Sequence, residues 1–168
     1  MTEIHNPREL FLHELGDILY VERSLADEAL PKLIGEVKDE EFKSGLESHL
    51  EQTQRHVTNL EKVFEIFGET PHEEECIAFE GLKKEHEEMT KESSSSLIDL
   101  VDLGAAARTE NYEIAAYESL RRMAKGLGEQ KAVDLLDTNL KYEKETLREV
   151  ERIATWLSNE IAQQAAAA

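Results

Sequence analysis

The chain has 168 residues, 40% of them hydrophobic, which suffices for one domain with one core. Its 37 acidic residues exceed its 19 basic residues, and the formal net charge is −18. This charge argues against nucleic acids and anionic membranes as partners, because both are bound through Lys and Arg clusters. No apolar run reaches the roughly 18 residues of a transmembrane helix, and no secretion signal opens the sequence. We therefore expect a cytoplasmic protein.

Helix-breaking glycines and prolines, together with the spacing of apolar residues, predict two long helices in the first half of the chain. The first covers about residues 7–35, with Asn6 as its N-cap. Pro31 should kink this helix or end it early, because proline lacks the backbone N–H and clashes with the preceding turn. The second helix covers about residues 39–67, with Asp39 as its N-cap.

In the second half of the chain, the same signals predict two further long helices after a long connection. This connection, Glu69–Ser95, contains a short predicted helix over Cys76–Met89. The third long helix begins at Ser96 and Asp99, which resemble a capping box. The fourth covers about residues 129–161 and is followed by a tail that we expect to be frayed.

Two tight helical hairpins joined by one long crossover indicate the fold class. A helix of about thirty residues is about 45 Å long. If the third helix runs parallel to the second, the chain must travel back over that length, and only a long connection can do so. The prediction is an all-α, ferritin-like four-helix bundle whose crossover holds a short fifth helix. It forms a single domain over residues 1–168, with a core of about residues 7–162.

Each long helix carries an apolar stripe that polar side chains interrupt. Glu22, Gln52, Glu110 and Glu143 lie about 15–17 residues from the nearest hairpin turn, or about 22–25 Å along the helix. Antiparallel pairing therefore gathers the interruptions at one level in the middle of the bundle. The full set of candidate residues adds two histidines of the second helix and one glutamate at the edge of the third stripe: Glu22, His49, Gln52, His56, Glu110, Glu113 and Glu143.

These residue types together indicate a metal site. Converging buried carboxylates repel one another unless they are protonated, paired or bound to a metal. Four glutamates carry four negative charges, which two divalent ions would balance, and His49 and His56 offer neutral nitrogen ligands. Carboxylates with imidazole suit iron or manganese. We expect one or two such ions, held as in other helical-bundle carboxylate proteins.

Ordinary structural roles remain open for the same residues. Any one of the glutamates could be solvated or ion-paired in a sequence this acidic. His49 could be a hydrogen-bonded core histidine, and Gln52 a structural hydrogen-bonder. Tyr117 could donate a hydrogen bond to a ligand or simply fill the core. Cys76 is expected to be packed rather than reactive, since no base is adjacent in sequence.

Several segments resemble the YciF-like family of ferritin-like four-helix proteins. The first helix contains the Asp-x-x-x-x-Glu signature as Asp17 and Glu22. The other matches, in chain order, are the segments 49–53, 76–82 and 110–115. Together they extend the resemblance over roughly residues 7 to 155.

The resemblance implies a homodimer associated with bacterial stress responses. It implies metal ligands at Glu22, His49, Glu110, Glu113 and Glu143. Gln52 stands where family members commonly have Glu, so the site of this chain has one carboxylate fewer. Ferritins and rubrerythrins also carry Glu-x-x-His on the second and fourth helices, and Thr146 replaces that histidine in the fourth.

Two functions follow as hypotheses. In the first, bound metal supports oxidation or scavenging of a small-molecule oxidant such as peroxide. In the second, the protein is not an enzyme, and its helices form a homodimer or bind a partner while the polar cluster is structural. Apolar residues beside the main stripes, namely Val63, Phe67, Ile153 and Trp156, predict a dimer contact.

Overall fold

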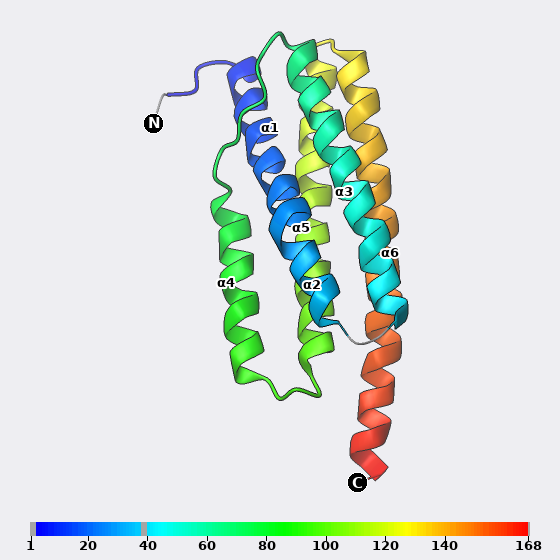
Figure 1. Ribbon diagram of the computed structural model, residues 1–168. Helices are drawn as coiled ribbons and strands as arrows, with labels where there is room; N and C mark the ends of the chain where they lie inside the picture. The colour runs from blue at the N-terminus through cyan, green and yellow to red at the C-terminus, as the bar shows by residue number, and fades with distance from the viewer. Residues whose placement is uncertain (1–2, 38–39, 168) are drawn as a thin grey trace.

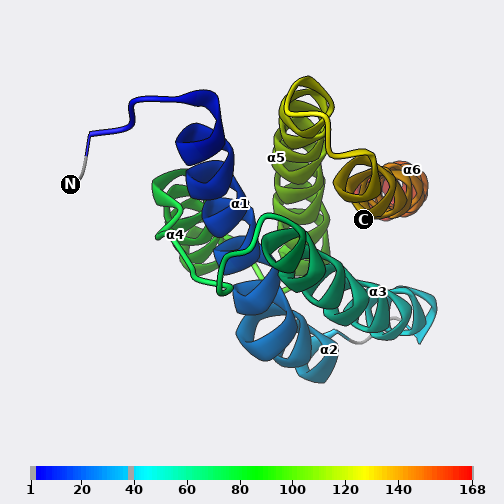
Figure 2. The ribbon, with the colours of Figure 1, turned by 90° about the horizontal axis from the view of Figure 1, so that it is seen from above.

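The computed structural model describes residues 3–37 and 40–167, and every regular element in these ranges is helical. Asp39, the expected cap of the second helix, lies outside the described residues. The four long helices pack as a bundle, and α4 lies along its outside (Figures 1 and 2). The elements in chain order are α1 (Pro7–Ser24), η1 (Leu25–Ala29), α2 (Leu30–Glu36), α3 (Glu40–Ile66), α4 (Ile77–Glu92), α5 (Ile98–Gly126) and α6 (Gln130–Ala167).

The topology is the predicted one. α1 and α3 form one antiparallel hairpin, and α5 and α6 form the other (Figure 1). α3 and α5 run parallel, so the chain must return along the bundle between them. α4 makes that return, and it packs on α5. The all-α ferritin-like bundle with a helix in its crossover is therefore confirmed.

The first helix differs from expectation at Pro31. An early end at Pro31 is wrong, because α2 continues to Glu36. The irregularity lies just before, in the π-helical turn η1, where Leu30 N–H bonds Leu25 C=O. This turn makes Pro31 a first-turn residue of α2, where the missing N–H costs little.

Two helix ends also differ from expectation. α5 begins at Ile98, and its N-cap Leu97 makes no side-chain cap bond. The predicted capping pair is therefore wrong: the Ser96 hydroxyl pairs with the Ser94 hydroxyl at 3.0 Å. At the other end of the chain, α6 continues to Ala167, beyond the expected end near residue 161.

The N-cap at Asn6 is confirmed, since Asn6 Oδ1 accepts a bond from Glu9 N at 2.9 Å. The core that fixes the bundle consists of apolar residues from every long helix, with Phe11, Phe64 and Leu136 among the fully buried ones. Among the described residues, no helix is both long and apolar enough to cross a bilayer.

Candidate metal centre

Six of the seven candidate side chains are buried together in the middle of the bundle. Glu22 comes from α1, His49 and His56 from α3, Glu110 and Glu113 from α5, and Glu143 from α6. None of the six is more than 8% exposed, and Glu22 and Glu143 are fully buried. The antiparallel pairing predicted from the turns therefore places them at one level.

A first set of possible ligands is formed by Glu22, His56 and Glu143. One ligand atom from each lies within 4.8 Å of the others. His56 Nδ1 is 2.7 Å from Glu143 Oε1 and 3.2 Å from Glu22 Oε1. His56 also lies beside the Tyr142 ring, with centroids 6.0 Å apart.

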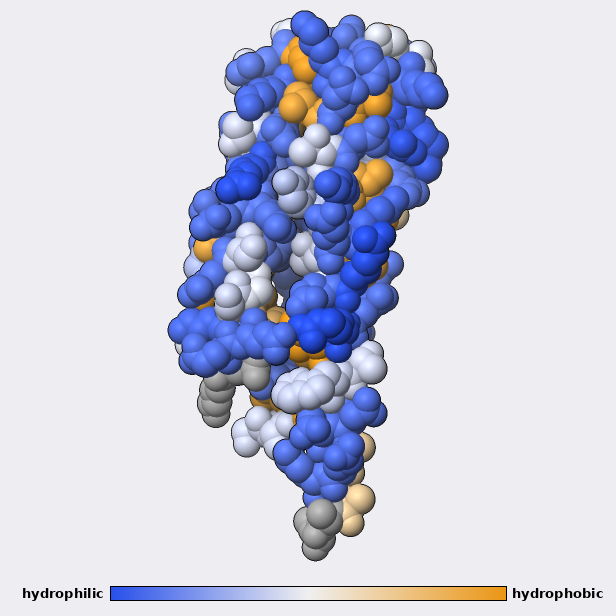
Figure 3. Space-filling model, turned by 90° about the vertical axis from the view of Figure 1, so that its right-hand side faces the viewer, coloured by the Kyte–Doolittle hydropathy of each residue, from blue (hydrophilic) through white to orange (hydrophobic). Residues whose placement is uncertain are grey.

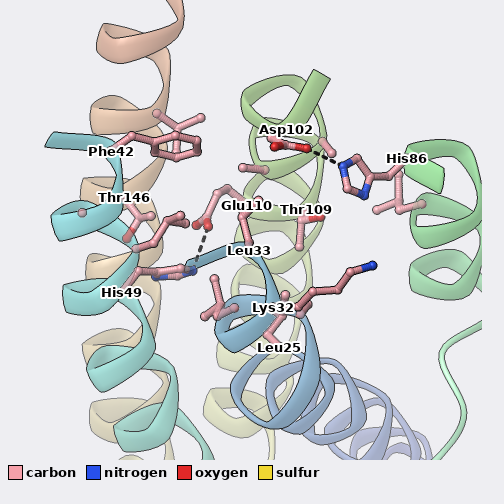
Figure 4. Close-up of a pocket in the computed structure, with 18 of the residues that line it drawn as sticks. Leu25, Lys32, Leu33, Phe42, His49, His86, Asp102, Thr109, Glu110 and Thr146 are labelled. Atoms are coloured by element: carbon pink, nitrogen blue, oxygen red, sulfur yellow. Dashed lines mark hydrogen bonds and ion pairs between the residues drawn. The ribbon is translucent and has the colours of Figure 1, made fainter. Parts of the chain in front are cut away.

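A second set is formed by His49, Glu110 and Glu143, again within 4.8 Å of one another. His49 Nε2 is 3.2 Å from Glu110 Oε1, the contact drawn in Figure 4. Glu143 belongs to both sets. A carboxylate shared by two neighbouring ligand sets is the arrangement that a dinuclear carboxylate site requires.

Glu113 and Gln52 lie outside both sets. Glu113 is one turn beyond Glu110, 1% exposed, and neither of its oxygens has a hydrogen-bond partner among the described residues. Gln52 is only half-buried, and its Oε1 accepts a long 3.5 Å bond from the Thr146 hydroxyl. Gln52 is thus adjacent to the site, on the side where Thr146 replaces a possible histidine.

The cluster contains unpartnered polar atoms, which test whether it fits a metal. Within the described part of the chain, several buried ligand-type atoms make no hydrogen bond: Glu22 Oε2, His49 Nδ1, His56 Nε2, Glu110 Oε2, both oxygens of Glu113 and Glu143 Oε2. An unpartnered buried polar atom costs about 1–3 kcal/mol. A donor set of carboxylate oxygens and imidazole nitrogens fits iron or manganese.

The protonation states follow from burial and charge. Burial raises the pKa of Glu110 and of Glu113 well above the usual range, and the Glu143 carboxylate raises both further. Burial lowers the pKa of His49, which favours the neutral imidazole that binds metals.

His56 behaves in the opposite way. Burial opposes its protonation, but the carboxylates of Glu22 and Glu143 outweigh burial and raise the pKa of His56 to about 10. Burial would likewise raise the pKa of Glu143, yet the hydrogen bond from His56 lowers it. Without a cation, these directions favour a charged His56–Glu143 pair beside protonated Glu110 and Glu113.

Two buried residues support Glu22 and His56 from behind. The Tyr117 hydroxyl donates to Glu22 Oε1 and accepts a 3.1 Å bond from Asn139 Nδ2. The same Asn139 amide lies 3.3 Å from the His56 carbonyl. Sequence reasoning left Tyr117 open and missed Asn139. Asn139 lies one turn before Glu143 on the same face of the helix, and this spacing could have identified it as a neighbour of the cluster.

Comparisons with known proteins agree with this architecture. The family model described as a domain of unknown function, DUF892, matches residues 6–167. Protein YciF of Escherichia coli (strain K12) is 32% identical over 140 residues, covering 82% of this chain and 84% of YciF.

Solved structures show the same fold. YcfI from Rhodopseudomonas palustris has a TM-score of 0.85 and 36% identity, covering 89% of this chain and 95% of YcfI. The E. coli stress protein YciF has a TM-score of 0.85 and 31% identity, covering 93% and 99% of the two chains. A protein from Xanthomonas campestris pv. campestris, with a TM-score of 0.75 and 17% identity, shares the fold alone. The match over nearly the whole chain and the two close folds place this protein in the DUF892 family, among the YciF-like proteins.

Proposed function

We propose that this protein is a stress-associated, metal-binding member of its family with a dinuclear iron or manganese centre. The observation that carries the proposal is the pair of buried ligand sets that share Glu143. Glu22 and His56 would hold one ion, and His49 and Glu110 the other. Glu113 is the adjacent carboxylate with no other partner among the described residues.

The charges support two divalent ions. Glu22, Glu110, Glu113 and Glu143 would carry four negative charges when ionised, and burial makes that state costly without cations. Bound iron or manganese would supply redox chemistry towards a small oxidant such as peroxide. The protein's own part is to hold Glu22 through the Tyr117 hydroxyl and to keep His49 neutral.

A purely structural cluster is the alternative, and the His56–Glu143 pair at 2.7 Å favours it. That pair provides a partner for one imidazole nitrogen and for one carboxylate oxygen. It leaves Glu113 and one oxygen of Glu110 buried without a partner among the described side chains. The metal centre accounts for these groups as well, so it is the function we propose. The stress role is extended to this chain from YciF, which is named a stress protein.

The test is elemental analysis of protein purified without chelator. We expect a metal-to-protein ratio near two for the wild type. Glu143→Ala should lose both ions because it removes the shared ligand, whereas Glu22→Ala should lose the ion of its own set first. Glu151→Ala and Glu14→Ala change exposed glutamates of the same two helices and serve as controls. An unchanged ratio in both site variants would exclude this centre.

A further inference from the structure

A cavity of about 470 Å³ lies directly beside the candidate metal centre. It is open to solvent on one side and is lined mainly by side chains from η1, α2, α3, α4, α5 and α6 (Figure 4). Its volume is in the range of small-molecule sites. Most of its inner wall is apolar, with Leu25, Leu33, Phe42, Leu46, Val150 and Ile153 from four different elements.

The polar groups of the cavity are concentrated at particular places. His49 and Glu110 line it, and they are the members of the two ligand sets that do so. Gln52 and Thr146 lie beside them. Across the cavity, His86 Nε2 lies 2.7 Å from Asp102 Oδ1, joining α4 to α5 (Figure 4).

Six further charged residues of the lining are exposed and stand at the rim. They have both signs: Glu28, Lys32, Glu36, Glu87, Glu145 and Glu149. A molecule that enters therefore passes a charged rim, meets an apolar wall, and reaches oxygen and nitrogen ligands only at the His49–Glu110 end. The Glu22–His56 side of the centre does not line the cavity.

The π-helical turn η1 shapes this wall. It directly follows α1, three residues after Glu22. Leu25 and Ala29 of the turn line the cavity, and so do Leu30 and Leu33 of α2. π-helical turns are found frequently at functional sites, because the wider turn redirects the side chains that follow. One helical path thus contributes a ligand to the centre and an apolar wall to the cavity.

We propose that the cavity binds an organic molecule with an aliphatic body and one oxygen-bearing end that carries no positive charge. The body lies against the apolar wall, and the oxygen end faces His49 and Glu110. A cationic end group is disfavoured, because it would be repelled by the ion of the second ligand set and desolvated by the apolar wall. This proposal rests on the proposed function in one respect: the oxygen end would face the ion of the second ligand set.

The experiment compares molecules that share one chain and differ in their end group. Binding of 1-decanol, decanoate and decylamine is measured by displacement of the uncharged fluorophore N-phenyl-1-naphthylamine. We expect 1-decanol and decanoate to displace it about tenfold better than decylamine.

Ala106→Phe tests the location, since Ala106 lines the cavity one turn before Glu110. It should weaken decanol binding by about tenfold or more by filling the space. Ala115→Phe adds the same ring on the exposed face of the same helix and should leave binding unchanged. Leu33→Gln, which makes the opposite wall polar, provides a second variant if Ala106→Phe fails to fold by circular dichroism.

Several results would overturn the cavity proposal. One is that decanol does not displace the fluorophore from the wild type. Another is that Ala106→Phe and Leu33→Gln both bind decanol as tightly as the wild type does. A third is that decylamine binds as tightly as decanol. Binding that falls as protein concentration rises would show that a second copy of the chain occupies the cavity, which also overturns it. Metal analysis of the same preparations separates the two proposals. If the protein holds no metal as purified, the metal-centre proposal is wrong. If that same protein binds decanol and Ala106→Phe weakens the binding, the cavity proposal is supported.

Discussion

Glutamates of the same chemical type have different roles in this protein, and their neighbours decide which. Glu143 faces His56 at 2.7 Å, and this contact lowers its pKa despite complete burial. Glu113 has no such partner among the described residues, and burial raises its pKa well above the usual range. Glu151 is exposed to water on the same helix as Glu143. Helical periodicity places Glu143 on the apolar stripe of α6, but it does not reveal the partner that makes Glu143 anionic.

Tyr117 tests how far support from behind controls the centre. Tyr117→Phe removes the hydroxyl that donates to Glu22 and accepts from Asn139, while the ring keeps filling the core. We expect metal affinity to fall by about 10–100-fold and the metal-free protein to lose about 1 kcal/mol of stability. Titration with Mn²⁺ and urea unfolding measure the two effects. Tyr142→Phe, which keeps the ring beside His56, is the matched control; equal losses in both variants would contradict a specific role for Tyr117.

Gln52 tests the effect of charge next to the centre. Gln52→Glu places a carboxylate beside the His49–Glu110 set, so it should tighten divalent-metal binding by up to about tenfold through Coulomb attraction. Calorimetric titration with Mn²⁺ measures the change. Gln54→Glu adds the same charge at an exposed position of the same helix and should have little effect. Weaker binding in Gln52→Glu would mean that this side chain serves Thr146 rather than the metal.

At the scale of elements, the crossover helix α4 is anchored by a cysteine. Cys76 is its N-cap, and Sγ accepts a 3.3 Å bond from Phe79 N. The thiol donates in turn to the Tyr112 hydroxyl at 3.0 Å, and Tyr112 donates to Asp17 at 2.6 Å. Burial raises the pKa of Cys76 and keeps the thiol protonated, as a donor must be. The expected packed cysteine thus ties the crossover to α5 and α1.

The cap gives a paired prediction. Cys76→Ser preserves an acceptor for Phe79 N and a donor for Tyr112, so its stability should stay within about 0.5 kcal/mol of the wild type. Cys76→Ala removes both and leaves a buried amide unpaired, which should cost about 1–2 kcal/mol. Urea unfolding of the two variants measures this difference. A serine variant as unstable as the alanine variant would show that packing volume, not capping, is the contribution of Cys76.

At the scale of the whole molecule, an acidic surface surrounds an apolar core that contains one cluster of buried glutamates and histidines. The face in Figure 3 is covered mainly by hydrophilic side chains, with small apolar areas between them. Most of the residues expected at a dimer contact are instead packed inside the bundle. Val63 and Ile153 are buried within the bundle, and Phe67 packs on Phe11 with centroids 4.6 Å apart. Of the four residues predicted to widen the apolar surface, only Trp156 is exposed, at 51%.

The homodimer remains a prediction, now centred on Trp156. It belongs to α6, and the C-terminal end of this helix extends past the rest of the bundle (Figure 1). We expect light scattering to show a dimer at micromolar concentration and Trp156→Glu to shift it towards the monomer. Ser158→Glu, an exposed change on the same helix, is the control. Trp156 is the single tryptophan, so a blue shift of its emission on association reports the contact directly. A monomeric wild type would refute the dimer.

The pattern of apolar and polar residues along the chain determined the helices, their order and the level at which the polar side chains meet. These properties depend on helix rise and on the lengths of the turns, which a sequence displays directly. The start of α5 and the π turn before Pro31 were not predictable in this way, because competing local hydrogen bonds decide them.

Only the tertiary structure decided how the cluster is organised. It made Glu143 the carboxylate common to both sets, placed His56 between Glu22 and Glu143, and left Gln52 at the edge. It also opened a cavity on the His49 side of the cluster. Each of these depends on the rotation of one helix against another, and packing between helices sets that rotation. No spacing within a single helix contains that information.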